Sequence, residues 1–125
     1  CGEEALRRIL GGQMISQEEF SGRYYKKALD AKKILTNEVI KAFEKVDIIA
    51  MPVVPKLPHK FGEKISAEDE YDYDTLTVVA NLTGIPGISV PNGKIDNLPV
   101  GIQLFAAVGE DFKLLEVAEK FEEEA

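Results

Sequence analysis

The chain has 125 residues, 45% of them hydrophobic, which is enough for one domain with a real core. Its net charge at pH 7 is −7, and the excess of Asp and Glu over Lys and Arg lies in residues 47–125. This part of the chain is therefore unsuited to binding nucleic acid phosphates. The sequence has no apolar run of the roughly 20 residues that a membrane helix needs, no signal-peptide pattern at its acidic start, and a single cysteine, which excludes an internal disulfide. We therefore expect a cytoplasmic protein that does not associate with membranes.

The first part of the chain predicts two helices. Residues 3–13 form a short helix, which Gly11 and Gly12 should end because glycine is costly inside a helix and common just past one. Ser16-Gln17-Glu18-Glu19 matches a capping box, which satisfies the first backbone N–H groups of a helix. A long helix should run from there to about Lys45, because apolar residues recur at steps of three or four. They form one stripe: Phe20, Tyr24, Ala28, Ala31, Leu35, Val39, Ala42 and Val46.

A buried strand at 47–51 and a long loop are predicted next. The strand ends at Pro52, and two further prolines make the following stretch extended, because proline fixes φ and removes a hydrogen-bond donor. The loop continues through the acidic residues Glu68, Asp69, Glu70 and Asp72. A helix over about 75–82 follows, with Asp74 as its N-cap.

The remaining residues predict two apolar strands, about 86–91 and 99–106, and a final helix over about 111–124. Turn-prone pairs, Asn92-Gly93 and Asp96-Asn97, join the strands. The helix should bury Leu114, Leu115, Val117, Ala118 and Phe121. Strands that are apolar on both faces need helices on both sides. The predicted fold class is α/β, with a short mixed sheet of about three strands packed by helices, and we expect the sheet to continue in chain not present here.

Catalytic and metal-binding patterns are absent from the sequence. Nucleophilic catalysis needs a nucleophile, a base within reach and oxyanion donors. His59, the single histidine, lies in a proline-bounded loop, and Ser89 lacks the second glycine of a nucleophile elbow. One cysteine and one histidine do not make a usual zinc site. We therefore expect no catalytic residue, no metal site and no cofactor in this chain.

Four blocks of the sequence resemble the amidase signature family, in the family's order. They are Leu6-Arg7-Arg8-Ile9-Leu10-Gly11, Ser21-Gly22-Arg23-Tyr24-Tyr25-Lys26-Lys27-Ala28, the strand and P-x-x-P turn of Val46–Pro55, and Asn81–Leu104. The last block resembles amidase signature enzymes in general. The first two resemble the A subunits of glutamyl/aspartyl-tRNA(Gln/Asn) amidotransferases. The resemblance covers essentially residues 1–125 and implies the C-terminal segment of an amidase signature domain.

The resemblance also implies an activity for the parent protein. Such a protein hydrolyses glutamine and passes the ammonia to a B subunit, which uses ATP and Mg to amidate Glu-tRNA(Gln) or Asp-tRNA(Asn), while a C subunit holds the two together. The family's catalytic serines and lysine lie upstream, so this chain alone should be inactive. By the same resemblance Arg8 would bind the α-carboxylate of glutamine and Asp74 its α-ammonium group. Asp72 competes with Asp74 for that position.

Two other functions stay open at this point. One alternative is that the chain is the C-terminal portion of a plain amidase, in which Arg8 and Asp74 would bind a different amide substrate. The other is that it is a free-standing structural or adaptor module without catalytic activity. If the chain is a fragment separated from the rest of its parent protein, its unpaired strand edges and bare apolar helix faces should make it a homo-oligomer.

Overall fold

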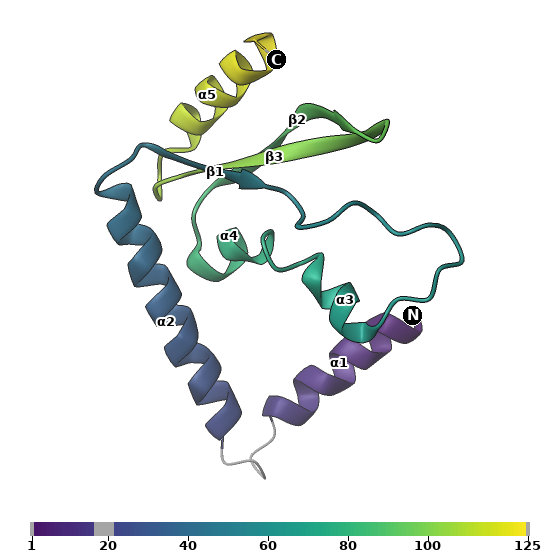
Figure 1. The fold of residues 1–125 in the computed structure, drawn as a ribbon. Coiled ribbons are helices and arrows are strands. Elements are labelled where there is room, and N and C mark those ends of the chain that lie inside the picture. The colour runs from purple at the N-terminus through teal and green to yellow at the C-terminus, as the bar shows by residue number, and fades with distance from the viewer. Residues whose placement is uncertain (1, 17–21, 125) are drawn as a thin grey trace. The chain divides into compact units, whose positions relative to one another are not determined.

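The computed structural model describes residues 2–16 and 22–124. Their helices and strands, in chain order (Figure 1), are α1 (Glu3–Ser16), α2 (Arg23–Phe43), β1 (Ile48–Pro52), α3 (Ala67–Asp72), α4 (Val78–Thr83), β2 (Gly87–Ile95), β3 (Leu98–Ala106) and α5 (Asp111–Glu124). The chain divides into two compact units, Cys1–Asn37 and Glu38–Ala125. None of the described helices is long and apolar enough to cross a membrane.

Helix α1 is longer than the sequence indicates. Gly11 and Gly12 lie inside it, so the prediction that they end the helix is wrong. The reason is one of magnitude: a glycine costs a helix only about 1 kcal/mol, which the flanking helix-forming residues outweigh. Ser16 is the last residue of α1, and the rest of the predicted capping box, 17–19, lies outside the described residues.

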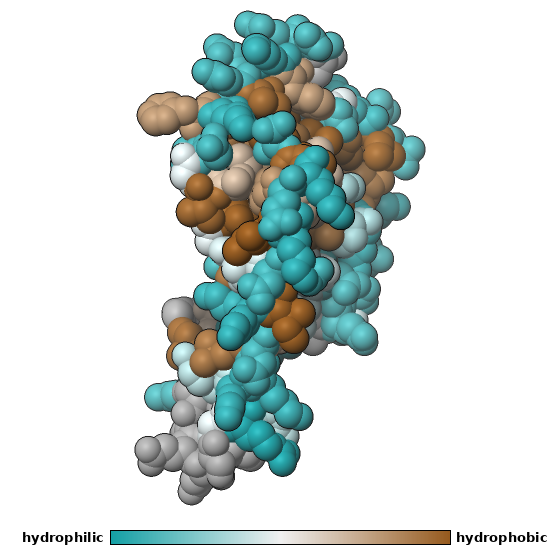
Figure 2. Space-filling view, turned by 90° about the vertical axis from the view of Figure 1, so that its left-hand side faces the viewer, coloured by the Kyte–Doolittle hydropathy of each residue, from teal (hydrophilic) through white to brown (hydrophobic). Residues whose placement is uncertain are grey.

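Helix α2 carries the predicted apolar stripe, but the described residues bury little of it. No residue of α2 is buried. Leu35, Val39 and Ala42, in the later part of the stripe, are half-buried, whereas Tyr24 is 51% exposed. Figure 2 shows apolar side chains between polar ones on one face of the molecule. The periodicity therefore predicted this helix, but α2 begins at Arg23 and not directly after Ser16.

The second unit is built on a three-stranded sheet of order β1-β3-β2 (Figure 1). The sequence predicted a mixed sheet of about three strands, and both pairings among the three are antiparallel. Strands β2 and β3 are joined by Asp96 and Asn97, whose φ angles of 51° and 63° suit a tight hairpin turn. Asn92 and Gly93 are not a turn: the register shifts between Pro91 and Lys94, so they form an irregularity within β2.

Helices lie on both faces of this sheet (Figure 1). On one face α5 packs against β2 and β3, and the core there consists of Val90, Leu104, Ala106, Leu114 and Ala118. Phe105 is 2% exposed. A Cβ at Gly87 would meet both the Phe105 ring and Ala80 of α4, so the Phe105 ring lies on the α4 side. Figure 1 shows α4 on the face of the sheet opposite α5. The bounds predicted for the last helix are confirmed, but Leu115 is 54% exposed and does not join the core. It follows Leu114 by about 100° around the helix, which turns it away from the sheet.

The acidic stretch between β1 and β2 is more ordered than predicted, because it contains α3. Ser66 is the N-cap of α3, and its hydroxyl accepts a hydrogen bond from the backbone N–H of Asp69. Acidic residues in the first turn favour this helix through its dipole. The next helix, α4, begins at Val78 with Thr77 as N-cap, so the prediction that Asp74 caps it is wrong. Residues 73–77 form turns, which delay the start of α4.

Candidate functional site

The two residues predicted to bind substrate lie in different units. Arg8 is an exposed residue of α1, in the first unit. Asp74 is an exposed residue of the turn between α3 and α4, in the second unit. Their side chains are of the types that bind a carboxylate and an ammonium group, respectively.

The backbone of Asp74 is held by hydrogen bonds on both sides. Its N–H donates to the carbonyl oxygen of Tyr71 at 3.0 Å. Its own carbonyl oxygen accepts from the N–H of Val78 at 3.1 Å and from the hydroxyl of Thr77 at 3.2 Å. The turn thus ends α3 and leads into α4, with Asp74 between the two helices.

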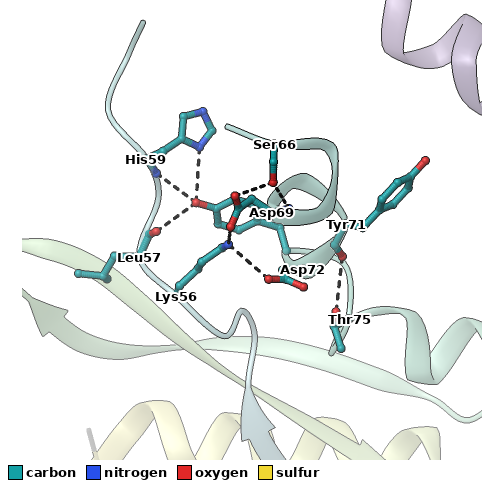
Figure 3. A network of polar contacts seen from close by, with 9 residues as sticks. Lys56, Leu57, His59, Ser66, Asp69, Tyr71, Asp72 and Thr75 are labelled. Atoms are coloured by element: carbon teal, nitrogen blue, oxygen red, sulfur yellow. Dashed lines mark hydrogen bonds and ion pairs between the residues drawn. The ribbon is translucent and has the colours of Figure 1, made fainter. Parts of the chain in front are cut away.

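A polar network beside this turn connects the loop after β1 to α3 (Figure 3). The ammonium group of Lys56 lies 2.8 Å from a carboxylate oxygen of Asp69 and 3.5 Å from one of Asp72. The second oxygen of Asp69 accepts from the hydroxyl of Ser66 at 2.7 Å. Asp72, the competitor of Asp74 in the sequence, is therefore engaged with Lys56 in this network.

Tyr73 extends the network to the loop that follows Lys56. Its hydroxyl donates to the carbonyl oxygen of Leu57 at 3.2 Å and accepts from the backbone N–H of His59 at 3.2 Å. The imidazole of His59 lies beside the same hydroxyl, with Nδ1 at 3.4 Å. The ammonium group of Lys56 stands 5.2 Å from the centre of the Tyr73 ring, within the range of a cation–π contact.

The ion pair shifts the pKa values of both partners. Hydrogen bonds from Lys56 and Ser66 lower the pKa of the Asp69 carboxyl from 3.8 to about 2. The hydrogen bond with Asp69 raises the pKa of Lys56 above its ordinary 10.5. The side chains are 35% and 51% exposed, so solvent screens their attraction. The network is therefore better suited to fixing geometry than to adding much stability.

An apolar groove of about 790 Å³ lies on the same unit, beside the end of β1. It is lined by Ala50–Pro58, Asn92, Ile95 and Pro99–Ile102. Lys56 is the one charged residue among these lining residues, and it connects the groove to the polar network.

The side chains with catalytic potential lie apart from one another or in structural positions. His59 is exposed and contacts Tyr73, and Ser89 pairs with Gln103 across the sheet. Over residues 2–16 and 22–124, no three His, Cys, Asp or Glu side chains are grouped to hold a metal ion.

Sequence reasoning missed the network and one buried polar residue. Lys56 and Tyr73 are separated from their partners by 13 to 17 positions, and no periodicity links them. Gln103 is 4% exposed, and its side-chain N–H₂ donates to the carbonyl oxygen of Pro52 at 2.9 Å. A polar residue inside the apolar run of β3 was the one available signal for this bond, which ties the end of β1 to β3.

Comparison with known proteins gives consistent results. The family model described as Amidase matches residues 1–115. The chain is 55% identical over 115 residues to the A subunit of glutamyl-tRNA(Gln) amidotransferase from Methanosphaera stadtmanae, and 52% identical over 122 residues to that from Methanocaldococcus jannaschii. These matches cover 92% and 98% of the chain but 25% and 28% of the relatives. The chain thus spans about a quarter of the length of the curated relatives it matches.

Solved structures agree with this comparison. The crystal structure of the glutamyl-tRNA(Gln) amidotransferase A subunit from Thermotoga maritima superposes with a TM-score of 0.81 at 33% identity, over 99% of this chain and 27% of that one. A structure described as an amidase superposes with a TM-score of 0.80 over 99% of this chain and 29% of that one. Its identity is 24%, so that likeness concerns the fold alone.

Proposed function

The chain belongs to the amidase family, and on that premise we propose that it is the C-terminal portion of the glutamine-hydrolysing A subunit of a tRNA-dependent amidotransferase. One observation carries the proposal. Over nearly its whole length the chain is about half identical to relatives named as the A subunit of glutamyl-tRNA(Gln) amidotransferase. In this role the chain supplies core structure and substrate-binding residues, and the catalytic serines and lysine come from the part of the protein that precedes it.

Arg8 and Asp74 are the proposed substrate-binding residues. The guanidinium group of Arg8 binds the α-carboxylate of glutamine, a planar group that suits a bidentate partner. The carboxylate of Asp74 accepts hydrogen bonds from the α-ammonium group. Asp72, its competitor in the sequence, lies 3.5 Å from the ammonium group of Lys56.

The partners follow from the same proposal. The ammonia passes to a B subunit, which amidates Glu-tRNA(Gln) or Asp-tRNA(Asn) with ATP and Mg, and a C subunit joins the two. The tRNA meets the complex through the B subunit, and this chain holds no cofactor of its own. The complex works in the cytoplasm. Without the rest of its parent protein, the chain associates with itself through its exposed apolar side chains.

A chimera tests the proposal. In the A subunit of Methanocaldococcus jannaschii, the region that matches this chain is replaced by residues 1–125. The chimera should release ammonia from glutamine, and the 125-residue chain alone should release none. Arg8→Lys and Asp74→Asn should each lower kcat/KM for glutamine roughly thirty-fold or more, because losing one partner of a charged hydrogen bond costs on the order of 2–5 kcal/mol. Ammonia-dependent amidation of tRNA by the assembled complex should persist.

Matched controls make the result specific. Arg23→Lys changes an exposed arginine of α2, and Asp96→Asn changes an exposed turn residue whose φ of 51° asparagine tolerates. Both should leave glutamine kinetics unchanged. Unchanged kinetics in Arg8→Lys and Asp74→Asn would refute the assignment of these residues. A folded chimera that hydrolyses simple amides but not glutamine would instead identify a plain amidase.

A further inference from the structure

Tyr73 directly precedes the proposed ligand of the substrate ammonium group, and its own side chain is fixed at the hydroxyl. A tyrosine hydroxyl has one proton to donate and lone pairs to accept with. Here the proton goes to the carbonyl oxygen of Leu57 and a lone pair accepts from the N–H of His59, both at 3.2 Å. The ring is half-buried. The side chain of Tyr73 is thus anchored to a loop 14 to 16 positions earlier in the chain.

Lys56 makes a second set of contacts to Tyr73 and to α3, the helix that precedes it. Its ammonium group stands 5.2 Å from the centre of the Tyr73 ring and pairs with Asp69 and Asp72, which belong to α3. The loop after β1 is therefore joined to the end of α3 through both ion pairs and the aromatic ring.

These contacts determine where the backbone of Asp74 lies. On its C-terminal side, the first turn of α4 binds its carbonyl oxygen through Val78 and Thr77. On its N-terminal side, the anchored Tyr73 fixes the backbone. With both sides held, the backbone of Asp74 is fixed, which lowers the entropy lost when its carboxylate binds a ligand.

From this geometry we propose that Tyr73 is a positioning residue, which sets where the Asp74 carboxylate meets the α-ammonium group of glutamine. The inference rests on the proposed function, since it assigns Tyr73 a role only through Asp74. The substrate that Asp74 binds is an α-amino acid amide, and Tyr73 itself does not contact this substrate.

Tyr73→Phe in the chimera tests the proposal, because it removes the hydroxyl and keeps the ring beside Lys56. A hydrogen bond of this kind contributes on the order of 1 kcal/mol, so KM for glutamine should rise about five-fold. The kcat should change by less than about two-fold, because the ammonium group is bound alike in ground state and transition state. Tyr25→Phe, which removes the hydroxyl of an exposed tyrosine of α2, is the matched control and should change neither.

A double-mutant cycle separates positioning from a general structural role. In the Asp74→Asn background, Tyr73→Phe should have no further effect on kcat/KM, because Tyr73 acts through the carboxylate that is gone. An equal effect in both backgrounds would overturn the proposal and leave the function of the chain intact, as would unchanged KM in Tyr73→Phe alone. If Asp74→Asn itself keeps full glutamine kinetics, the proposed role of Asp74 fails, and that of Tyr73 fails with it.

Discussion

The close approach of the Phe105 ring to Gly87 predicts a cost for adding a single methyl group at Gly87. Gly87 on β2 lies opposite Phe105 on β3, and a Cβ at Gly87 would stand 2.8 Å and 2.9 Å from two ring carbons of Phe105. Ala80 of α4 would lie 3.5 Å away on the same side. Phe105 is 2% exposed, so its ring has no solvent to move into.

The expected magnitude follows from this overlap. Overpacking a core costs typically about 1–3 kcal/mol, and alanine recovers roughly 0.5–1 kcal/mol of that relative to glycine within a strand. From the middle of these two ranges, we expect Gly87→Ala to lower the free energy of unfolding by about 1 kcal/mol. Urea unfolding of the 125-residue chain, followed by circular dichroism at one fixed chain concentration, measures the change.

Two further variants test the physical reason. Phe105→Leu shortens the obstructing ring, so Gly87→Ala should cost less in that background, with a coupling of at least about 0.5 kcal/mol. Gly12→Ala is the matched control, because a Cβ there meets nothing within 4 Å and alanine favours the helix α1. An unfolding free energy of Gly87→Ala within about 0.3 kcal/mol of the parent, or strict additivity with Phe105→Leu, would refute the reasoning.

Two other predictions concern association and acid. Four apolar side chains of α1 are 50–59% exposed: Leu6, Ile9, Leu10 and Met14. A few hundred Å² of such surface favours self-association by several kcal/mol, at roughly 25 cal/mol per Å². Sedimentation at micromolar concentration should therefore show oligomers that persist in high salt, and a stable monomer would contradict this. The lowered pKa of Asp69 means that its ion pair contributes above pH 3.8 and is lost as the pH falls through about 2. Nuclear magnetic resonance titration of the Asp69 carboxyl should give a midpoint near 2 that returns toward 3.8 in Lys56→Met, and a midpoint near 3.8 in the parent would disprove the pairing.

The sequence by itself determined the elements that depend on local signals. The 3.6-residue periodicity indicated α2 and gave the bounds of α5, and the apolar runs between proline, glycine and asparagine indicated the three strands. These signals act between neighbours in the chain, so they need no knowledge of the fold. The resemblance of four sequence blocks indicated the family, which the comparisons show.

Only the tertiary structure decided where the long-range polar contacts form. The bonds of Lys56 to Asp69 and of Tyr73 to Leu57 join residues that the sequence assigned to one loop, and Gln103 is satisfied by a carbonyl oxygen 51 positions away. Helix α4 starts at Val78, with Thr77 and not Asp74 as its N-cap, after turns at 73–77 whose first residue, Tyr73, belongs to that network. Such contacts depend on which segments the sheet and helices bring together, and local sequence preferences of about 1 kcal/mol per residue yield to them.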